Sequence, residues 1–371
     1  MTDRAKPAAN PRSGELQLDE IDESNNAKLA ARGAFYDRLR PQNLAPLWEV
    51  LNNLLPAEPH SKAVPCRWRY SDVRPLLLES GRLLTASEAE RRVLVLENPA
   101  LAGQSRATAT LYAGVQLILP NEVARAHRHT PSALRFFLEG RGAFTTVGGE
   151  RTTMRPGDFV ITPAWAFHAH GSDGSEPCVW LDGLDLPIVS FFEAGFAEHP
   201  EGEVQAPFAP EGHSLAQFGQ GLLPISSQRP FGLTSPVFSY PYERTLEALL
   251  SVSRGEPPDP YHGAALRYSN PLDGGWAMPT MSSWIFHLPR GFETAPIRST
   301  DGIVLAVSEG RGRATVSGME MDFEEKDVIA IPGWSWRSFK ADDDCILFAF
   351  SDRVAQEKLG LFREQKSELA K

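Results

Sequence analysis

The chain has 371 residues, of which 42% are hydrophobic and 23% are charged. This length allows two domains that each bury a core of their own, and the composition is that of a globular protein rather than a disordered one. The net charge of −10 argues against a broad phosphate-binding surface, so we expect no nucleic-acid partner.

The cysteines and the N-terminal segment predict a cytoplasmic protein. Cys66, Cys178 and Cys345 lie far apart and lack the spacing of a metal site, which favours free thiols in a reducing compartment. Residues 1–15 are polar and contain no apolar core of a signal peptide. No run approaches the roughly 20 apolar residues that span a bilayer, so we expect no membrane association.

The first 90 residues predict a disordered start followed by helices. Residues 1–14 are rich in Pro, Asn, Ala and Lys and are expected to be disordered. Apolar residues recur with a helical period from about residue 16 until Pro41 interrupts the pattern, and a second short helix is expected at 47–55. A third is expected to begin near Pro75, because proline suits the first helical position. Residues 15–90 are therefore interpreted as a helical N-terminal region.

From about Arg92 the pattern changes to short apolar or alternating runs separated by Gly, Pro and Asn, which is typical of a β-barrel or sandwich. This pattern occupies residues 91–200 and returns over 280–352. A Pro-rich linker and inter-domain segment is expected at 201–279, and a C-terminal helix at 353–371. The predicted fold class is mainly β, with two β-domains in one chain.

An internal repeat relates these two β-domains. The first copy has Glu139-Gly140-Arg141-Gly142, then Asp158, then Pro163-Ala164-Trp165, and the second has Glu309-Gly310-Arg311-Gly312, then Asp327, then Pro332-Gly333-Trp334. The step from Asp to Pro is the same in both copies. Such shared spacing indicates two homologous domains.

A group of histidines predicts a metal site in the first copy. His127 and His129 are two residues apart, so on a strand both side chains point to the same face. His168 follows the next turn and strand and could bring a third imidazole beside them. A single histidine is as readily a hydrogen-bonded structural residue, but three in this pattern favour metal binding. Imidazole suits iron, copper, nickel and zinc, so the ligands alone do not name the metal.

The His-x-His pair, the Glu-Gly-x-Gly turn, Pro156-Gly157-Asp158 and the later His168 resemble the two motifs of the cupin fold. We therefore expect two cupin domains, which are double-stranded β-helices of the jelly-roll type. The first cupin motif usually adds a Glu shortly after His-x-His, but residues 130–135 contain no carboxylate. The expected site is therefore a three-histidine one, with open positions for a bidentate anion and dioxygen.

Longer motifs resemble the gentisate 1,2-dioxygenase family, which includes salicylate and 1-hydroxy-2-naphthoate dioxygenases. The similarity covers roughly residues 40–352. The matching segments are 46–48, 61–65, 98–99, 111–116, 126–136, 163–170, 180–185 and 270–271.

The resemblance implies a ring-cleaving dioxygenase with one Fe(II) per chain in the first cupin domain and O2 as co-substrate. In this family both oxygen atoms enter between the carboxyl- and hydroxyl-bearing ring carbons of a small aromatic hydroxy acid, and gentisate would give maleylpyruvate. Salicylate, a 5-substituted salicylate and 1-hydroxy-2-naphthoate remain alternative substrates. The resemblance also implies a homotetramer.

Beyond the metal ligands, the sequence predicts a set of substrate residues. Strand alternation places Arg135 on the same interior as the histidines, and arginine suits bidentate carboxylate recognition. The resemblance implies a positioning and catalytic set of Arg91, Gln116, Arg135, His170 and Asp182. His170 could hydrogen-bond the substrate or dioxygen, and Asp182 could hold a ring N–H in place.

Several of these residues also have a plain structural interpretation, and Gln116 and Asp182 could be ordinary strand residues. Either Arg91 or its neighbour Arg92 could lie at the surface, and Arg135 could be a buried ion-pair partner. The Tyr112 hydroxyl could contact a polar group at ring position 5, which favours gentisate. Leu47 and Leu55 could line the pocket, although leucine more often packs in a helix core.

The second cupin domain lacks the ligands. Arg337 stands where His168 stands in the first copy, five residues after the repeat's proline, and residues 294–298 contain no histidine. We expect this domain to bind no metal and to serve packing or assembly, with His287 structural. Two other classes stay open, namely a metal cupin isomerase without oxygenase activity and a non-enzymatic sensor or storage cupin.

Overall fold

The computed structural model describes residues 13–200, 207–226 and 231–368. Most of the segment expected to be disordered, 1–14, lies outside these residues. The chain divides into two compact units, residues 1–58 and 59–371, and each is considered by itself.

The N-terminal unit is helical, as predicted. It contains α1 (Ser13–Leu39), a 3-10 turn η1 (Arg40–Gln42) and α2 (Leu47–Leu54). Pro41 lies in η1, where the first helix ends. Within this unit Tyr36 donates to Glu49 at 2.5 Å and the Trp48 indole donates to Tyr36 at 2.9 Å, so two hydrogen bonds join α1 to α2.

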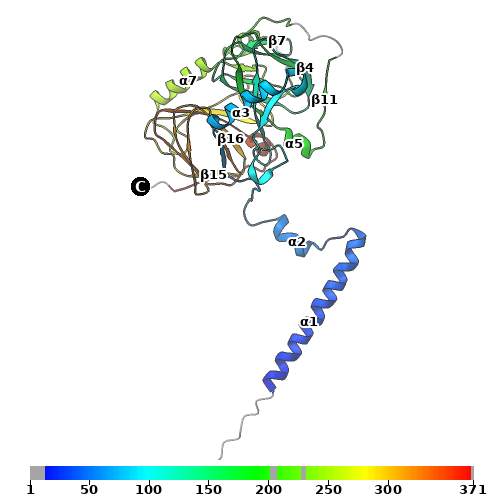
Figure 1. The fold of residues 1–371 in the computed structure, drawn as a ribbon. Helices are drawn as coiled ribbons and strands as arrows, with labels where there is room; N and C mark the ends of the chain where they lie inside the picture. Colours follow the sequence, from blue (N-terminus) through cyan, green and yellow to red (C-terminus); the bar gives the residue numbers. More distant parts are fainter. Residues whose placement is uncertain (1–12, 201–206, 227–230, 369–371) are drawn as a thin grey trace, which may run out of the picture. The chain divides into compact units, whose positions relative to one another are not determined.

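The larger unit contains two β-rich halves that lie side by side (Figure 1), each built from one six-stranded and one five-stranded antiparallel sheet. The first half has strand orders β12-β8-β5-β10-β3-β2 and β11-β4-β9-β6-β7, and the second has β1-β19-β16-β21-β14-β13 and β18-β17-β20-β15-β22. The predicted mainly β fold with two cupin domains is therefore confirmed.

The strands of the first half are β2 (Arg92–Val95), β3 (Tyr112–Ile118), β4 (Val123–His129), β5 (Ala133–Glu139), β6 (Ala143–Val147), β7 (Glu150–Thr153), β8 (Phe159–Thr162), β9 (His168–Ser172), β10 (Cys178–Leu184), β11 (Ala197–Glu198) and β12 (Ser239–Tyr240). Those of the second half are β1 (Cys66–Trp68), β13 (Ala264–Arg267), β14 (Ser282–Leu288), β15 (Ile297–Ser299), β16 (Ile303–Glu309), β17 (Gly312–Val316), β18 (Met319–Phe323), β19 (Val328–Ile331), β20 (Arg337–Ala341), β21 (Cys345–Ser351) and β22 (Glu364–Lys366). The remaining helical elements are α3 (Tyr70–Leu83), α4 (Ala86–Ala89), η2 (Pro99–Leu101), α5 (Leu186–Phe191), α6 (His213–Phe218), α7 (Tyr242–Gly255) and α8 (Arg353–Lys358).

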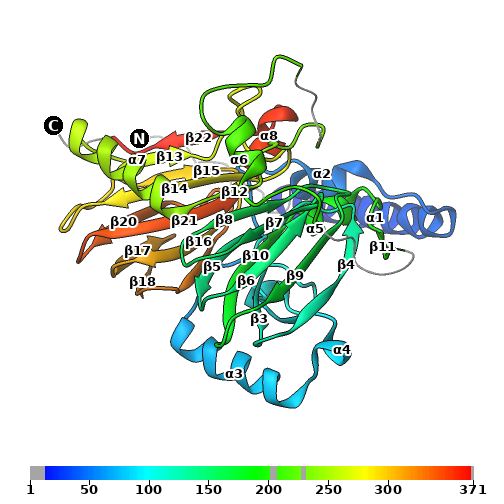
Figure 2. The same ribbon diagram turned by 90° about the horizontal axis from the view of Figure 1, so that it is seen from above.

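Each half receives a strand from the segment that precedes the other half. Strand β1 comes before the first half in the chain but pairs with β19 of the second, and β12 comes before the second half but pairs with β8 of the first. The helices that follow these strands, α3 and α7, return to their own halves (Figure 2). This exchange makes the two halves one packing unit.

The aspartates of the sequence repeat hold the starts of those two helices. Asp158 accepts the backbone N–H of Tyr242, the first residue of α7, at 2.8 Å, and Asp327 accepts the N–H of Tyr70, the first residue of α3, also at 2.8 Å. A carboxylate at a helix start satisfies a donor that has no partner inside the helix and complements the helix dipole. The repeated aspartates therefore help to hold the segments that the two halves exchange, in addition to being part of the β-domains.

Three boundaries differ from the sequence prediction. Helix α3 begins at Tyr70 and contains Pro75 in its interior, because its start is set by the distant Asp327 rather than by the proline. The segment 201–279 is more than a linker, since it supplies α6, α7 and an edge strand to each half. The C-terminal helix covers only Arg353–Lys358, because Gly360 adopts a φ of 72° and β22 then pairs with β15.

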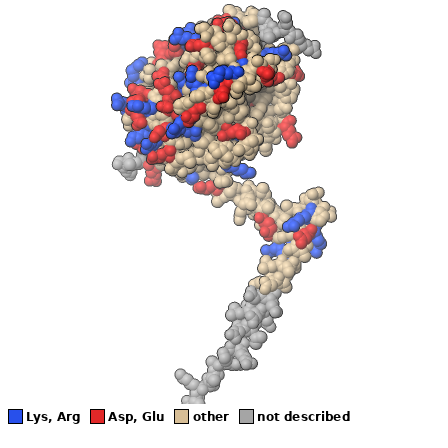
Figure 3. Space-filling model, viewed as in Figure 1, with Lys and Arg blue, Asp and Glu red and all other residues tan. Residues whose placement is uncertain are grey.

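The charged surface, the free cysteines and the helix lengths each bear on an expectation from the amino-acid composition. Acidic and basic side chains are interspersed over the face of residues 59–371 seen in Figure 3. The cysteines Cys66, Cys178 and Cys345 are all unpaired, as predicted. No helix among the described residues is long and apolar enough to cross a membrane.

The two halves share a core centred on stacked aromatic rings. Phe136 of β5 and Phe348 of β21 stack with centroids 4.3 Å apart and planes within 6°, and both side chains are fully buried. Phe159 of β8 and Tyr268 also pack against Phe348. The stack therefore joins strands of both halves directly.

We expect Phe348→Ala to lower the free energy of unfolding by about 3–5 kcal/mol, because it removes a buried ring and leaves a cavity between the halves. Leu83, which is 71% exposed, provides a control, since Leu83→Ala should change stability by less than about 0.5 kcal/mol. Chemical denaturation of both variants measures the difference. Equal stability of the two would show that the halves do not depend on this contact.

Candidate metal centre and substrate pocket

Two neighbouring strands bring the three predicted histidines together. His127 and His129 lie on β4, and His168 begins β9 directly opposite His127. The ring centroids are 4.3 Å apart for His127 and His168, 4.8 Å for His129 and His168, and 5.2 Å for His127 and His129. Their candidate ligand nitrogens all lie within 4.8 Å of one another.

A bulge in β4 makes this arrangement possible. Ala124 pairs with His170 and His127 pairs with His168, so three residues of β4 span the same step as two residues of β9. Because side chains alternate along a strand, the extra residue is what lets His127 face inward beside both histidines of β9.

Backbone carbonyls fix the orientation of two of the rings. The Nδ1 of His129 lies 2.7 Å from the carbonyl oxygen of Pro131, and the Nδ1 of His168 lies 2.9 Å from that of Ala166. A carbonyl only accepts, so both rings carry their proton on Nδ1 and present the Nε2 lone pair. The Nε2 of His168 is buried and has no hydrogen-bond partner among the described residues. A nitrogen that binds a metal ion is expected to lack such a partner.

The environment keeps all three imidazoles uncharged at neutral pH. Burial, and after it the positive charge of Arg91, lowers the pKa of His127 to about 3. Burial is also the main cause that lowers the pKa values of His129 and His168. Only the neutral ring can bind a metal, so this pocket has the protonation state that metal binding requires.

Arg91 contacts the third imidazole ring, that of His127, from outside the histidine cluster. Its guanidinium lies 2.6 Å from the Nδ1 of His127 and donates to the backbone oxygen of Arg125 at 2.8 Å. The same oxygen lies 3.4 Å from that Nδ1, so Arg91 and Arg125 compete for one ring nitrogen. Burial lowers the pKa of Arg91 to about 10. The neighbouring Arg92 instead pairs with Glu122 at 2.5 Å, which assigns Arg91 to the pocket and Arg92 to the structure.

Arg135 is held in the pocket by a chain of hydrogen bonds. It donates to the Thr162 hydroxyl at 2.5 Å and to the Nε2 of His170 at 2.9 Å. The Nδ1–H of His170 donates to Thr145 at 2.8 Å, and the Thr145 hydroxyl donates to the backbone oxygen of Ala169. Both nitrogens of His170 are thus engaged within the chain, and its pKa is lowered by burial and by Arg135.

Asp182 is the acidic partner of this arginine. Its Oδ1 lies 3.5 Å from the Nε of Arg135 and accepts the indole N–H of Trp180 at 3.0 Å. Asp182 does hold a ring N–H, but that ring is an indole and not a metal-binding imidazole. Burial raises the pKa of Asp182 to about 6, although Arg135 acts in the opposite direction.

Cross-strand pairing puts the other predicted polar residues on this inner face. Asp182 lies opposite both Arg135 and Gly114, and Gln116 lies opposite Trp180. Tyr112 is two residues before Gly114 and therefore shares the face. A Cβ at Gly114 would lie only 2.8 Å from the Tyr112 hydroxyl oxygen, so the absence of a side chain there gives the tyrosine its place.

The remaining predicted residues belong to the N-terminal unit. Leu47 and Leu55, at α2 and its C-terminal cap, are 55% and 74% exposed, and their role as pocket residues stays a prediction. The sequence did not predict the roles of Thr145, Thr162 and Trp180, which position His170, Arg135 and Asp182. Only knowledge of which strands pair could have identified them.

These residues fit a metal that binds nitrogen ligands. His129 and His168 present their Nε2 lone pairs, and His127 completes the group when its proton lies on Nδ1, so the three rings can supply half of an octahedral coordination shell. No carboxylate joins them in the described cluster. Arg135 is buried and Arg91 is partly buried, and their positive charges beside the cluster make the pocket suitable for an anionic ligand. Fold and site together define a two-domain cupin metalloprotein.

Comparisons with known proteins agree with this class. The cupin domain family matches residues 114–184. The chain is 49% identical over 336 residues to gentisate 1,2 dioxygenase 1 of Aquipseudomonas alcaligenes, covering 91% of this chain and 96% of that protein. It is 32% identical to 5-aminosalicylate 1,2-dioxygenase of Comamonas sp, covering 90% of this chain and 89% of that protein.

A solved structure of salicylate 1,2-dioxygenase from Pseudoaminobacter salicylatoxidans with gentisate is similar with a TM-score of 0.85 and 34% identity, covering 100% of this chain and 98% of that chain. The chain belongs to the gentisate 1,2-dioxygenase family of two-cupin proteins, and it is a ring-cleaving dioxygenase.

We expect the protein to bind one metal ion per chain and His127→Ala to lose it. Removing one of three ligands should weaken binding by more than the roughly 10- to 100-fold that loss of an outer partner costs. Elemental analysis after dialysis measures the content. The matched control is His287→Ala, because His287 is buried in the second half and contacts Ser253 and Asp344. Two metal ions per chain, or full retention in His127→Ala, would contradict the three-histidine site.

Proposed function

We propose that this protein is an Fe(II)-dependent dioxygenase that cleaves gentisate between its carboxyl-bearing and adjacent hydroxyl-bearing carbons to give maleylpyruvate. The observation that carries the proposal is the neutral three-histidine cluster with the buried Arg135 and the partly buried Arg91 beside it. An ortho-hydroxy acid matches both parts, since its two oxygens can chelate a metal while its charge is met by guanidinium groups.

His127, His129 and His168 would hold the iron, leaving open positions for the substrate oxygens and O2. When bound, the ion would act as a Lewis acid toward the phenolate and carry electrons between ring and dioxygen. The surrounding residues keep the three imidazoles uncharged, so the full charge of the ion would be available to an anionic substrate.

Arg135 is proposed to bind the substrate carboxylate. Its Nε is buried without a hydrogen-bond partner among the described residues, and its two terminal nitrogens are fixed by Thr162 and His170. A guanidinium oriented in advance loses little entropy when it binds a carboxylate. The geometry thus supports a role for His170 in orienting Arg135, while direct contact of His170 with substrate or O2 stays a prediction.

Arg91 and Gln116 are proposed to complete the polar wall, with Asp182 balancing the charge of Arg135. When His127 donates its Nδ1 proton to the Arg125 carbonyl, Arg91 no longer has an acceptor on that ring. The N–H of Arg91 that had faced this ring would then be available to the substrate, while the hydrogen bonds of Arg91 to backbone oxygens hold its guanidinium in place. This exchange would couple the ligand-competent tautomer of His127 to the substrate pocket.

Substrate choice is proposed to depend on Tyr112. Burial raises the pKa of Tyr112, so its hydroxyl stays protonated and can donate to a ring substituent. The 5-hydroxyl of gentisate supplies such a partner, whereas salicylate does not. Salicylate, 5-substituted salicylates and 1-hydroxy-2-naphthoate remain the alternative substrates, with Leu47 and Leu55 as proposed apolar contacts.

A homo-oligomer, predicted above to be a tetramer, is also part of the proposal. Three phenylalanines around α5 are largely exposed in the single chain, Phe191 at 81%, Phe192 at 61% and Phe196 at 56%. A cluster of exposed aromatic side chains is typical of an interface. Light scattering on the purified protein determines the state.

Oxygen-uptake screening of the iron-loaded protein tests the function. We expect gentisate to be consumed with one equivalent of O2 and to be preferred over salicylate, 5-aminosalicylate and 1-hydroxy-2-naphthoate by kcat/KM. In Tyr112→Phe the preference for gentisate over salicylate should fall about three- to tenfold, the value of one neutral hydrogen bond. A wild-type preference for salicylate, or an unchanged ratio in Tyr112→Phe, would contradict the proposed specificity.

Arg135→Lys keeps the charge but loses the planar fork, and a charge-assisted hydrogen bond lost in this way should lower kcat/KM about ten- to a hundredfold. Metal content should stay unchanged, because Arg135 is not a ligand. Gentisate kinetics, metal analysis and the melting temperature are measured on the same variant.

Arg92→Lys is the matched control, because Arg92 is equally buried but pairs with Glu122. It should lower the melting temperature with kinetics preserved. If Arg135→Lys behaves like this control, Arg135 is only the structural partner of Asp182 and does not bind the carboxylate.

A further inference from the structure

The second half keeps the skeleton of the metal site but carries different side chains. Strands β15 and β20 pair Ile297 with Arg337, as β4 and β9 pair His127 with His168. In both halves a tryptophan with positive φ donates its backbone N–H to the backbone oxygen of the last residue of the first strand. Trp165 donates to His129 in the first half, and Trp334 donates to Ser299 in the second. The place of His168 is therefore taken by Arg337 and that of His129 by Ser299.

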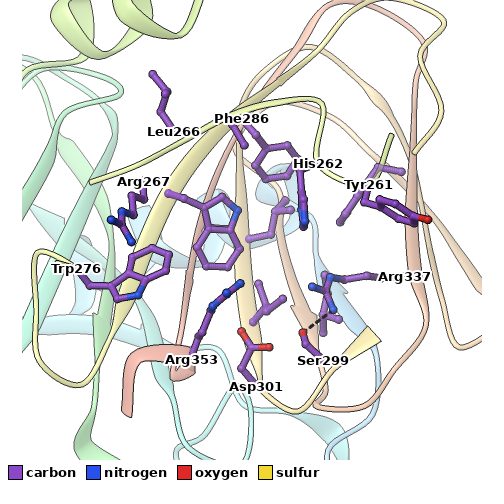
Figure 4. Close-up of a pocket in the computed structure, with 17 residues that line it drawn as sticks. Tyr261, His262, Leu266, Arg267, Trp276, Phe286, Ser299, Asp301, Arg337 and Arg353 are labelled. Atoms are coloured by element: carbon purple, nitrogen blue, oxygen red, sulfur yellow. Dashed lines mark hydrogen bonds between the residues drawn. The ribbon is translucent and has the colours of Figure 1, made fainter. Parts of the chain in front are cut away.

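A cavity of about 290 Å³ lies at this place (Figure 4). Its walls are largely apolar, and the aromatic residues Tyr261, Trp276, Trp284, Phe286 and Phe339 are among the lining residues. Ligand pockets begin near this size and combine apolar walls with a few oriented polar groups. In Figure 4 Arg337, Ser299 and Asp301 lie together along one side of the cavity, across from Trp276 and Phe286.

Arg337 is a buried cation with few partners. Arg337 is only 9% exposed. Among the described residues its guanidinium donates one hydrogen bond, to the Ser299 hydroxyl at 3.0 Å. The other arginines of the lining are engaged elsewhere. Arg353 pairs with Glu357 at 2.7 Å, and Arg267 donates to the backbone oxygen of Gly274 at 2.8 Å.

Asp301 supplies an acceptor without a donor. The residue is 3% exposed, and its buried Oδ1 has no hydrogen-bond partner among the described residues. In the same part of the chain no ion pair joins it to Arg337. Burial lowers the pKa of Arg337 and the charge of Asp301 raises it, so the two groups interact electrostatically without a direct hydrogen bond. Leaving the buried acceptor of Asp301 unpaired costs about 1–3 kcal/mol, which a ligand that donates a hydrogen bond would offset.

We propose that this cavity, defined by Arg337, Asp301 and the aromatic walls, binds one hydroxylated aromatic carboxylate per chain. The ligand's carboxylate would accept hydrogen bonds from the free N–H groups of Arg337. Its ring would lie among the aromatic side chains, and a ring hydroxyl would donate a hydrogen bond to Asp301 Oδ1. The guanidinium thus takes the electrostatic role that a metal ion has in the other half. The proposal needs no metal and no turnover.

Calorimetric titration of the iron-loaded protein with 3-hydroxybenzoate under nitrogen tests it. This probe lacks the ortho hydroxyl needed for chelation, and Arg135→Met removes the arginine that is proposed to bind the carboxylate in the first half. Arg135→Met should still bind one equivalent, and the double variant Arg135→Met/Arg337→Met should bind about ten- to a hundredfold more weakly. Equal affinity in a double variant with an unchanged melting temperature, or no binding in Arg135→Met, would overturn the proposal.

A second variant keeps the test decisive if Arg337→Met does not fold. In the Arg135→Met background, Asp301→Asn removes a negative charge beside the bound carboxylate. Benzoate, which has no hydroxyl, should then bind about three- to tenfold more tightly. The preference for 3-hydroxybenzoate over benzoate should fall at the same time. Unchanged or weaker benzoate binding would refute the assigned site.

Discussion

The site in the first barrel depends on one constraint, namely that three imidazole rings must present lone pairs to a common space while remaining uncharged. Burial supplies the neutrality, because a charged ring loses its hydration there. Burial alone would leave the tautomer undefined. The carbonyl groups of Pro131 and Ala166 define it for His129 and His168 by accepting the Nδ1 protons. The remainder of the pocket is built around this condition.

The arginine network follows from the same requirement. Buried positive charges next to neutral imidazoles further oppose protonation of the rings, as Arg91 does for His127 and Arg135 for His170. Those charges themselves need compensation. Asp182 provides it within the barrel, 3.5 Å from Arg135. The pocket therefore keeps a surplus of positive charge, which suits an anionic aromatic substrate.

The two halves share one framework but carry different inward-facing side chains. The register, the Trp–backbone hydrogen bond and the arginine stacked on that tryptophan are shared, with Arg128 over Trp165 and Arg298 over Trp334. What differs is the inward-facing set, three imidazoles in one half and a guanidinium with a hydroxyl in the other. The exchanged strands β1 and β12 and the Phe136–Phe348 stack bind the halves into one unit. A ligand bound in either half would therefore contact a domain that shares its hydrophobic core with the other half.

The sequence by itself determined the fold class, the repeat and the three histidines, because His-x-His spacing and turn residues act locally along a strand. It also separated the two halves, since Arg337 occupies the position of His168. It could not find the bulge between Ala124 and His127, the start of α3 at Tyr70, or the partners Thr145 and Thr162. These features depend on which strands pair and on contacts such as Asp327 with Tyr70, 257 residues apart. Only tertiary packing decides such contacts, because no local pattern distinguishes a threonine that orients an arginine from any other strand residue.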